Sequence, residues 1–228
     1  MISKQKLEKV KELLKRDYPT VETPLEHKDA LQLLIAVALS AQTLDSTVNK
    51  KTPALFEKYK TAEDFAKAKI EDLEKFIGGI NYYKTKSRNL VNLGKMIIEK
   101  FNGEVPGTME ELTELPGIGR KTANVIINEW FSKKNGTLPV GLVVDTHVLR
   151  VSKRLDLSDN GDNAVKVEQD LMKLFPQKEW EVWSLRIIFH GRFMCTARNP
   201  KCINDPEWSK ICGCVDEMKE LKNEKMKK

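Results

Sequence analysis

The 228-residue sequence lacks any long hydrophobic run. Its longest apolar stretch, Leu31–Leu39, is too short to cross a bilayer and is interrupted by Gln32. The first residues, Ile2–Tyr18, are charged throughout and have no continuous apolar core, so they lack the pattern of a secretory signal. We therefore expect an intracellular, cytoplasmic protein that has no membrane partner.

Histidine and strand-like patterns are also scarce. The three histidines, His27, His147 and His190, do not have the spacing of a zinc triad. No stretch alternates apolar and polar residues over several positions, and no repeat occurs at solenoid spacing. Helical periodicity instead runs through most of the chain, which predicts an all-α protein of about ten helices.

Basic residues exceed acidic ones. Lys and Arg total 39 against 33 Asp and Glu, which gives a formal charge of +6 and a pI of about 9.0. This balance favours a polyanionic partner such as a nucleic acid. A lysine-rich proteome would give the same balance, so the charge alone does not decide the partner.

All four cysteines lie near the end of the chain, at Cys195, Cys202, Cys212 and Cys214. Disulfides are rare inside cells, so these residues are either ordinary core thiols or the ligands of a metal.

Several helices can be placed from the sequence alone. Four of them are predicted to cover Ala30–Ser40, Leu44–Tyr59, Lys121–Phe131 and Trp180–Phe189. The first is apolar almost all round and should be a buried central helix capped by Asp29. Pro53 is expected near a helix start or at a kink. Ser132–Leu138 is predicted to be a polar loop, and Glu217–Lys228 a fraying helix.

One stretch suggests chemistry. A Pro-Gly-x-Gly turn, Pro116–Gly119, opens directly onto a predicted helix that begins with Arg120 and Lys121. Glycines let a ligand approach the backbone, and the start of a helix favours an anion. Asp145 follows in Val-Asp-Thr-His, 24 residues after Lys121. We predict that the turn grips a nucleic-acid phosphate beside Lys121 and Asp145, although a phosphate-binding lysine and a plain helix cap would give the same pattern.

Leu115–Ala123, followed by Val144–His147, resembles the endonuclease III branch of the helix-hairpin-helix DNA glycosylases. Supporting stretches are Leu34–Lys50, Asn102–Pro106 and His190–Cys195. The resemblance extends from about residue 5 to residue 214. It implies a two-lobed all-α fold with a C-terminal cysteine loop. One lobe would be a helical barrel over residues 23–133 that contains the helix-hairpin-helix, and the other would join residues 1–22 to 134–228.

The resemblance also implies an activity. It is base excision repair by a DNA glycosylase with abasic-site (AP) lyase activity, which removes oxidised pyrimidines from double-stranded DNA. Lys121 would form a Schiff base that β-elimination resolves, and Asp145 would assist. A monomer acting at the nucleoid is expected. A mismatch glycosylase for thymine or uracil opposite guanine, or a non-catalytic DNA-binding module, is the alternative.

Further DNA contacts follow from the same resemblance. Gln42 would fill the gap left by a flipped base, and Tyr82 stands where relatives carry a wedging leucine. Tyr82 and Tyr83 could equally pack between the lobes. The remaining expected contacts are Gly117, Gly119, Arg120, His147 and Arg150.

The cysteine loop departs from the family pattern. Relatives space their four cysteines by six, two and five residues, whereas the intervals here are six, nine and one. Asp205 and Ile211 stand where the third and fourth cysteines would be expected. We expect Cys195, Cys202, Cys212 and Cys214 to hold a [4Fe–4S] cluster, with zinc as the alternative.

Overall fold

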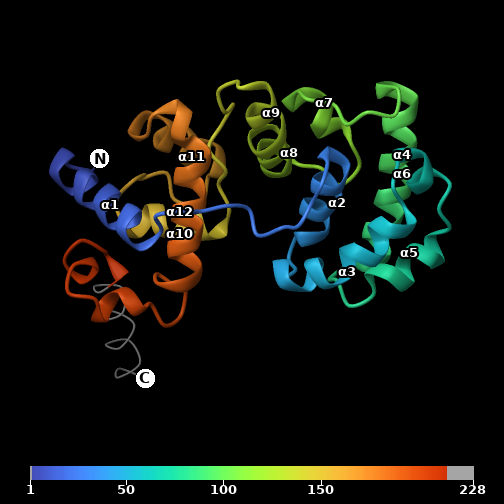
Figure 1. The fold of residues 1–228 in the computed structure, drawn as a ribbon. Helices are drawn as coiled ribbons and strands as arrows, with labels where there is room; N and C mark the ends of the chain where they lie inside the picture. Colours follow the sequence, from blue (N-terminus) through green and yellow to red (C-terminus); the bar gives the residue numbers. More distant parts are fainter. Residues whose placement is uncertain (1, 215–228) are drawn as a thin grey trace. The chain divides into compact units, whose positions relative to one another are not determined.

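The computed structural model describes residues 2–214, and every regular element among them is a helix (Figure 1). The all-α prediction is therefore confirmed for this part of the chain. The predicted helix at 217–228 lies outside the described residues. The α-helices are α1 (Lys4–Asp17), α2 (Ala30–Ser40), α3 (Asp45–Lys58), α4 (Ala62–Ala66), α5 (Ile70–Ile77), α6 (Tyr83–Phe101), α7 (Met109–Glu114), α8 (Arg120–Ile126), α9 (Lys133–Asn135), α10 (Thr146–Arg154), α11 (Ala164–Leu174) and α12 (Trp180–Phe193).

The chain divides into two compact units. The hairpin unit is Thr23–Val140, and the cysteine unit joins Met1–Glu22 to the chain from Gly141 onward. The segment 134–140, which was expected in the other lobe, groups with the hairpin unit. Hydrogen bonds tie it there, because Asn128 accepts the N–H of Val140 at 3.1 Å and Ser132 donates to the carbonyl of Leu138 at 3.3 Å.

Helix α2 forms the centre of the hairpin unit. Asp29 caps it by accepting the N–H of Gln32 at 2.8 Å, as predicted. Its apolar residues are buried on almost every side, because helices α3, α6 and α8 pack around it. Its buried residues are Leu33, Leu34, Ile35, Ala36, Val37 and Leu39.

Pro53 lies in the interior of α3 rather than near its start, so the helix has lost one backbone hydrogen bond there. One local prediction in the hairpin unit was wrong. The helix after the hairpin does not end at Phe131. It continues from α8 through a π-helical segment, Ile127–Ser132, into α9, so the first half of the predicted loop is helical.

The cysteine unit is built on α12. Helices α10 and α1 pack against α12, and a β-carbon at Gly191 would lie 2.8 Å from that of His147 on α10. α12 runs to Phe193, four residues beyond the predicted end, and His190 and Gly191 in this extension are buried. No helix between residues 2 and 214 is both long and apolar enough to cross a membrane.

Candidate functional site

The predicted hairpin is present between α7 and α8. Thr108 caps α7 by accepting the N–H of Glu111 at 3.3 Å. The turn closes where Ile118 donates its N–H to the carbonyl of Leu115 at 3.0 Å. The side chains of these two residues are buried, so the turn between them is anchored in the core while its glycines face outward.

The two hairpin glycines meet different surroundings. Gly117 has a φ of +81°, and a β-carbon there would lie 2.7 Å from the amide nitrogen of Asn89. Gly119 has an ordinary φ of −101°, and no atom lies within 4 Å of the position that its β-carbon would take. The fold itself therefore requires glycine at 117. At 119 the protein leaves open space above the start of α8.

Arg120 and Lys121 are the first two residues of α8, and both are exposed. Gly119 is the N-cap and supplies no side-chain acceptor. An anion at this end of the helix would meet backbone N–H groups and two cations. The protein does not bury the Lys121 side chain.

Gln42 and Tyr82 belong to the same unit as the hairpin. Gln42 follows α2 and Tyr82 precedes α6, and both side chains are exposed. Both have left-handed backbones, with φ of 56° and 58°. Non-glycine residues in this region are uncommon and concentrate at functional sites. Tyr82 is 66% exposed, whereas Tyr83 packs against the core of the hairpin unit itself.

Asp145 belongs to the cysteine unit, where it is half-buried and caps α10. One carboxylate oxygen accepts the N–H of His147 at 2.8 Å and that of Val148 at 3.0 Å. These bonds use the same oxygen, Oδ1. The cap therefore fixes the orientation of the carboxylate through Oδ1.

His147 and Arg150 lie one turn apart on α10. Arg150 donates to the carbonyl of Cys195 at 3.1 Å and to that of Gly191 at 2.8 Å, and it lies 3.1 Å from His147 Nδ1. Arg150 therefore holds the start of the cysteine loop. Burial lowers the pKa of His147. The nearby charges of Arg150 and Arg192 lower this pKa further, whereas the charge of Asp145 raises it.

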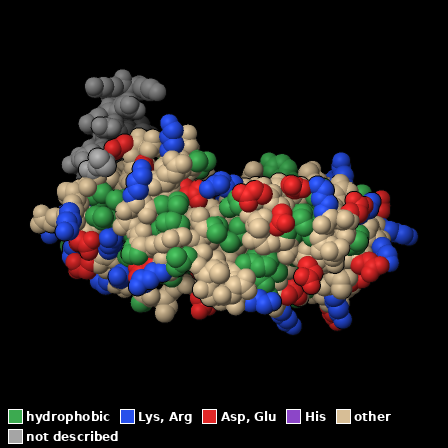
Figure 2. Space-filling view, turned by 90° about the horizontal axis from the view of Figure 1, so that it is seen from above, with side chains coloured by type: hydrophobic (Ala, Val, Ile, Leu, Met, Phe, Trp, Pro, Cys, Tyr) green, Lys and Arg blue, Asp and Glu red, His purple; other side chains and the backbone are tan. Residues whose placement is uncertain are grey.

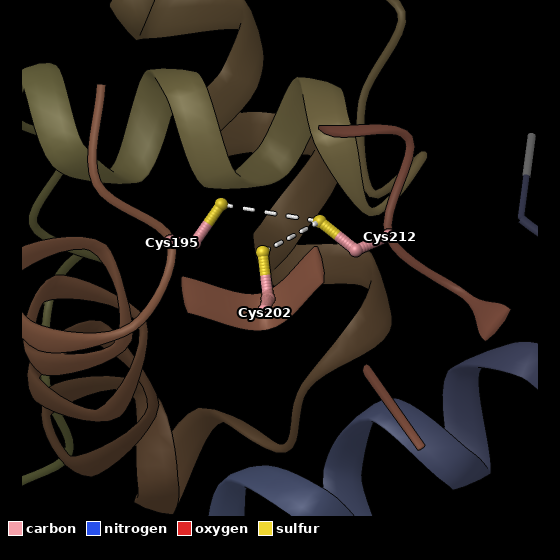
Figure 3. A group of neighbouring side chains, drawn as sticks. All are labelled: Cys195, Cys202 and Cys212. Atoms are coloured by element: carbon pink, nitrogen blue, oxygen red, sulfur yellow. Dashed lines mark hydrogen bonds between the residues drawn. The ribbon is translucent and has the colours of Figure 1, made fainter. Parts of the chain in front are cut away.

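The four cysteines converge in the same unit, and all are buried. The Sγ atoms of Cys195, Cys202 and Cys212 lie within 4.8 Å of one another (Figure 3). The Sγ of Cys212 is 3.9 Å from that of Cys195 and 3.7 Å from that of Cys202, and Cys214 Sγ is 2.8 Å from Cys202 Sγ. The altered spacing therefore still brings the thiols together.

The donor set fits a thiolate-bound metal. Hydrogen bonds from Cys195 and Cys202 lower the pKa of the Cys212 thiol to about 5, whereas hydrogen bonds with Cys195 and Cys212, together with burial, raise the pKa of the Cys202 thiol. Arg154 donates to Cys195 Sγ at 3.4 Å. Thiolates select zinc or iron–sulfur centres. Around a single ion with bonds of about 2.3 Å, tetrahedral sulfurs lie about 3.8 Å apart. The two distances from Cys212 match that value, whereas the 2.8 Å between Cys202 Sγ and Cys214 Sγ is shorter than four thiolates around one ion would give. A four-iron cluster would need the thiols to move apart.

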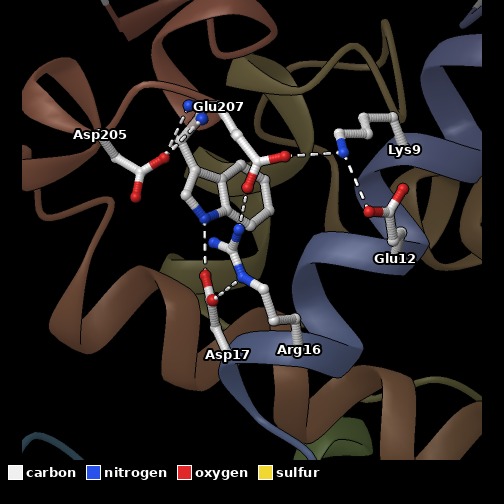
Figure 4. Close-up of polar contacts among 7 residues, drawn as sticks. Lys9, Glu12, Arg16, Asp17, Asp205 and Glu207 are labelled. Atoms are coloured by element: carbon white, nitrogen blue, oxygen red, sulfur yellow. Dashed lines mark hydrogen bonds and ion pairs between the residues drawn. The ribbon is translucent and has the colours of Figure 1, made fainter.

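The segment inserted between Cys202 and Cys212 is docked on α1 (Figure 4). Asp205, at the position expected for a cysteine, accepts the N–H groups of Glu207 and Trp208, each at 2.9 Å. Glu207 pairs with Lys9 at 2.8 Å and also with Arg16. Sequence reasoning missed this contact, because nothing in the local pattern links a loop to a helix about 190 residues away.

His190 packs beside this docked segment. Its ring centroid lies 4.1 Å from that of Trp208 and 6.2 Å from that of Tyr18. His190 is therefore a packing residue, and neither of its ring nitrogens has a hydrogen-bond partner among the described residues.

Basic side chains are not gathered into one patch on the face shown in Figure 2. Lys and Arg are interspersed there with Asp and Glu, and apolar side chains are scattered between them. The net charge of +6 therefore does not mark a binding surface on this face.

Comparison with known proteins places this geometry in a family. The model of the HhH-GPD superfamily of base excision DNA repair proteins matches residues 35–177. Endonuclease III of Synechocystis sp. is 43% identical over 87% of this chain and 88% of its own. Endonuclease III of Bacillus subtilis is 44% identical over 83% of this chain and 84% of its own.

Solved structures agree with these sequence matches. Endonuclease III trapped as a covalent intermediate with DNA superposes with a TM-score of 0.87 and is 41% identical, over 96% of this chain and all of the other. A thermostable thymine-DNA glycosylase superposes at 0.79 but is only 22% identical, so that likeness concerns the fold alone.

Proposed function

Because the chain belongs to the HhH-GPD superfamily of base excision DNA repair proteins and is a DNA glycosylase and abasic-site lyase of the endonuclease III type, we propose that it removes oxidised pyrimidines from double-stranded DNA through a Schiff base on Lys121. The observation that carries the proposal is the exposed Lys121 at the start of α8, directly after the open glycine turn.

The hairpin holds one phosphate of the damaged strand. The open space at Gly119 lets the DNA backbone approach the start of α8, and Arg120 supplies a cation beside it. Phosphate contacts of this kind fix the register of a protein on DNA without reading its sequence. The damaged nucleotide is flipped out of the stack, because its sugar is not accessible inside a duplex.

Lys121 then acts as the nucleophile. Its neutral amine forms a bond to the sugar C1′ as the bond from C1′ to the base breaks, and the base leaves with the electron pair and takes up a proton. The C1′–O4′ bond then breaks, O4′ takes up a proton and the lysine nitrogen loses its protons, so that the opened sugar is held as a Schiff base. Loss of the C2′ proton expels the 3′ phosphate and cuts the strand. The start of α8 and neighbouring Arg120 place positive charge beside the Lys121 amine.

Asp145 stabilises the positive charge that develops on the sugar, or moves the proton between the amine and the leaving base. One of its oxygens caps α10 and orients the carboxylate. Gln42 and Tyr82 occupy the space from which the nucleotide has been flipped, and the exposure of both side chains supports this assignment. His147 is placed to contact the adjacent phosphate or Asp145, whereas Arg150 acts through the cysteine loop.

A [4Fe–4S] cluster held by Cys195, Cys202, Cys212 and Cys214 is the proposed cofactor, supported by four buried thiols near one another, and zinc is the alternative. When bound, the metal crosslinks the loop and supplies no step of the reaction. The loop's basic residues, Arg192, Arg198 and Lys201, would then face phosphate. A visible absorption band with iron in the protein supports the cluster, and zinc as the sole metal contradicts it.

The test is covalent trapping with borohydride on an abasic duplex. Wild-type protein should give an enzyme–DNA adduct, and Lys121→Gln should give none. Lys75→Gln is the control, because Lys75 pairs with Asp72 on α5 and has no assigned role. An adduct with Lys121→Gln would remove this residue from the nucleophile role.

Borohydride trapping, read together with base release and strand cutting, distinguishes the two alternative functions. A mismatch glycosylase would release thymine or uracil opposite guanine without an adduct, and a DNA-binding module would bind abasic DNA without cutting it. The lysine argues against both. We also propose that the protein acts at the nucleoid and that one monomer acts on one lesion. Size-exclusion chromatography of the DNA complex tests the monomeric state.

A further inference from the structure

Two turns that belong to separate parts of the hairpin unit's sequence are joined to each other. The first connects α2 to α3 through Ala41–Leu44, and the second connects α5 to α6 through Gly78–Tyr82. The first contains Gln42 and the second contains Tyr82, the two exposed left-handed residues. We call them the Gln42 turn and the Tyr82 turn.

Asn81 makes the connection. Its side-chain amide donates to the carbonyl of Gln42, and its backbone N–H donates to Thr43 Oγ1 at 3.2 Å. Both bonds cross from one turn to the other over about forty residues of sequence. Asn81 is thus bonded to the backbone of Gln42 in the first turn and directly precedes Tyr82 in the second turn.

Lys86 strengthens the same junction. From the first turns of α6, its amine donates to the carbonyl of Leu39 at 2.8 Å and to that of Ala41 at 2.7 Å. A cation at this position also complements the C-terminal end of α2. Burial lowers the pKa of Lys86, since its amine lies inside the junction. The Gln42 turn is therefore held by α6 on one side and by Asn81 on the other.

The junction leaves the side chains of Gln42 and Tyr82 directed outward on a fixed backbone. Exposed loops otherwise lose conformational freedom when they bind, and that loss weakens binding. Bonds within the protein that fix the two turns in advance remove part of this cost. A link between the turns also means that displacing one side chain moves the other.

We propose that Asn81 is a positioning residue that couples the Gln42 turn to the Tyr82 turn, so that both side chains engage the base opposite the flipped nucleotide as one unit. The proposal rests on the proposed function and on the DNA roles given to Gln42 and Tyr82. The ligand is the unpaired base itself, contacted by an amide at its edge and an aromatic ring on its face. Asn81 touches neither the DNA nor the reacting atoms.

A double-mutant cycle tests the coupling. We expect Asn81→Ala to lower kcat/KM on an abasic duplex about tenfold in the wild-type background and less than twofold in a Tyr82→Ala background. Thr43→Val, which removes the hydroxyl acceptor, should follow Asn81→Ala, and Thr43→Ser should restore the wild-type value. Equal losses in the two backgrounds would overturn the proposal.

A binding measurement gives a readout independent of catalysis. The base opposite the abasic site is replaced by 2-aminopurine, whose fluorescence falls when it stacks. With Lys121→Gln protein bound, the further change Asn81→Ala should raise the emission about twofold, because Tyr82 no longer holds the base. Unchanged emission contradicts the proposal even if the wild-type enzyme cuts DNA. If the wild-type enzyme forms no borohydride adduct, the proposed function fails, while the fluorescence still decides the coupling.

Discussion

Trp208 donates its indole N–H to a carboxylate oxygen of Asp17 at 2.7 Å, although 191 residues separate them in the sequence. Trp208 is fully buried. Burial raises the pKa of the Asp17 carboxyl, but hydrogen bonds from Arg16 and Trp208 outweigh this effect and lower the pKa below its usual value. The inserted segment of the cysteine loop is thus anchored to α1 by a bond to a charged group.

We therefore expect Trp208→Phe to destabilise the protein by about 2–3 kcal/mol, because a buried hydrogen bond to a charged group is lost. Urea unfolding measures the change, and metal analysis should show partial loss of the bound metal. The control is Trp180→Phe, which removes an indole bond to the carbonyl of Phe175 in the same unit. Equal metal contents in the two variants would show that the anchor does not support the cysteine loop.

Two variants of Asp145 distinguish its role in folding from its role in the reaction. Asp145→Asn keeps the oxygen that accepts the N–H groups of His147 and Val148, so the unfolding free energy should change little. Asp145→Ala removes the cap and should cost about 1 kcal/mol. Both variants should lose base excision, since both lose the charge. An active Asp145→Asn enzyme would assign this residue to capping alone.

The hairpin glycines should respond differently to alanine. Gly117→Ala should destabilise the protein by about 1–3 kcal/mol, because φ is positive and the new methyl group meets Asn89. Gly119→Ala should cost less than about 1 kcal/mol and yet weaken DNA binding, because its methyl group occupies the open space. Thermal unfolding and DNA titration at fixed salt measure the two effects. Unimpaired binding by Gly119→Ala would place the phosphate elsewhere.

His147 should make stability depend on pH. Its pKa in the folded protein is lowered from an unfolded value of about 6.5, chiefly by burial. As the pH falls below 6.5 the unfolded state takes up the proton first, so the unfolding free energy falls until the folded pKa is reached. His147→Gln should remove this part of the pH dependence. Urea midpoints between pH 5 and pH 7.5 give the comparison, and identical slopes would contradict it.

Much of the fold could be predicted from the sequence because its signals are local. The apolar run of α2, its cap at Asp29 and the glycine turn each depend on residues within a few positions. The error at the end of the hairpin unit arose because polar composition alone predicted a loop. Ser132–Asn135 is polar yet helical, and the side chains of Ser132 and Asn128 bond to the segment that follows it.

The sequence by itself determined the helical class, the hairpin with Lys121 after it, Asp145 at the start of a helix and the gathering of cysteines near the end. These follow from residue type and short spacing. Only the tertiary structure decided that Lys121 is exposed, that Arg150 holds the cysteine loop, that Asn81 links the Gln42 and Tyr82 turns, and that Trp208 reaches Asp17. Each of these contacts or exposures depends on residues that the folded backbone brings together. None of them could be predicted from the spacing of residues along the chain.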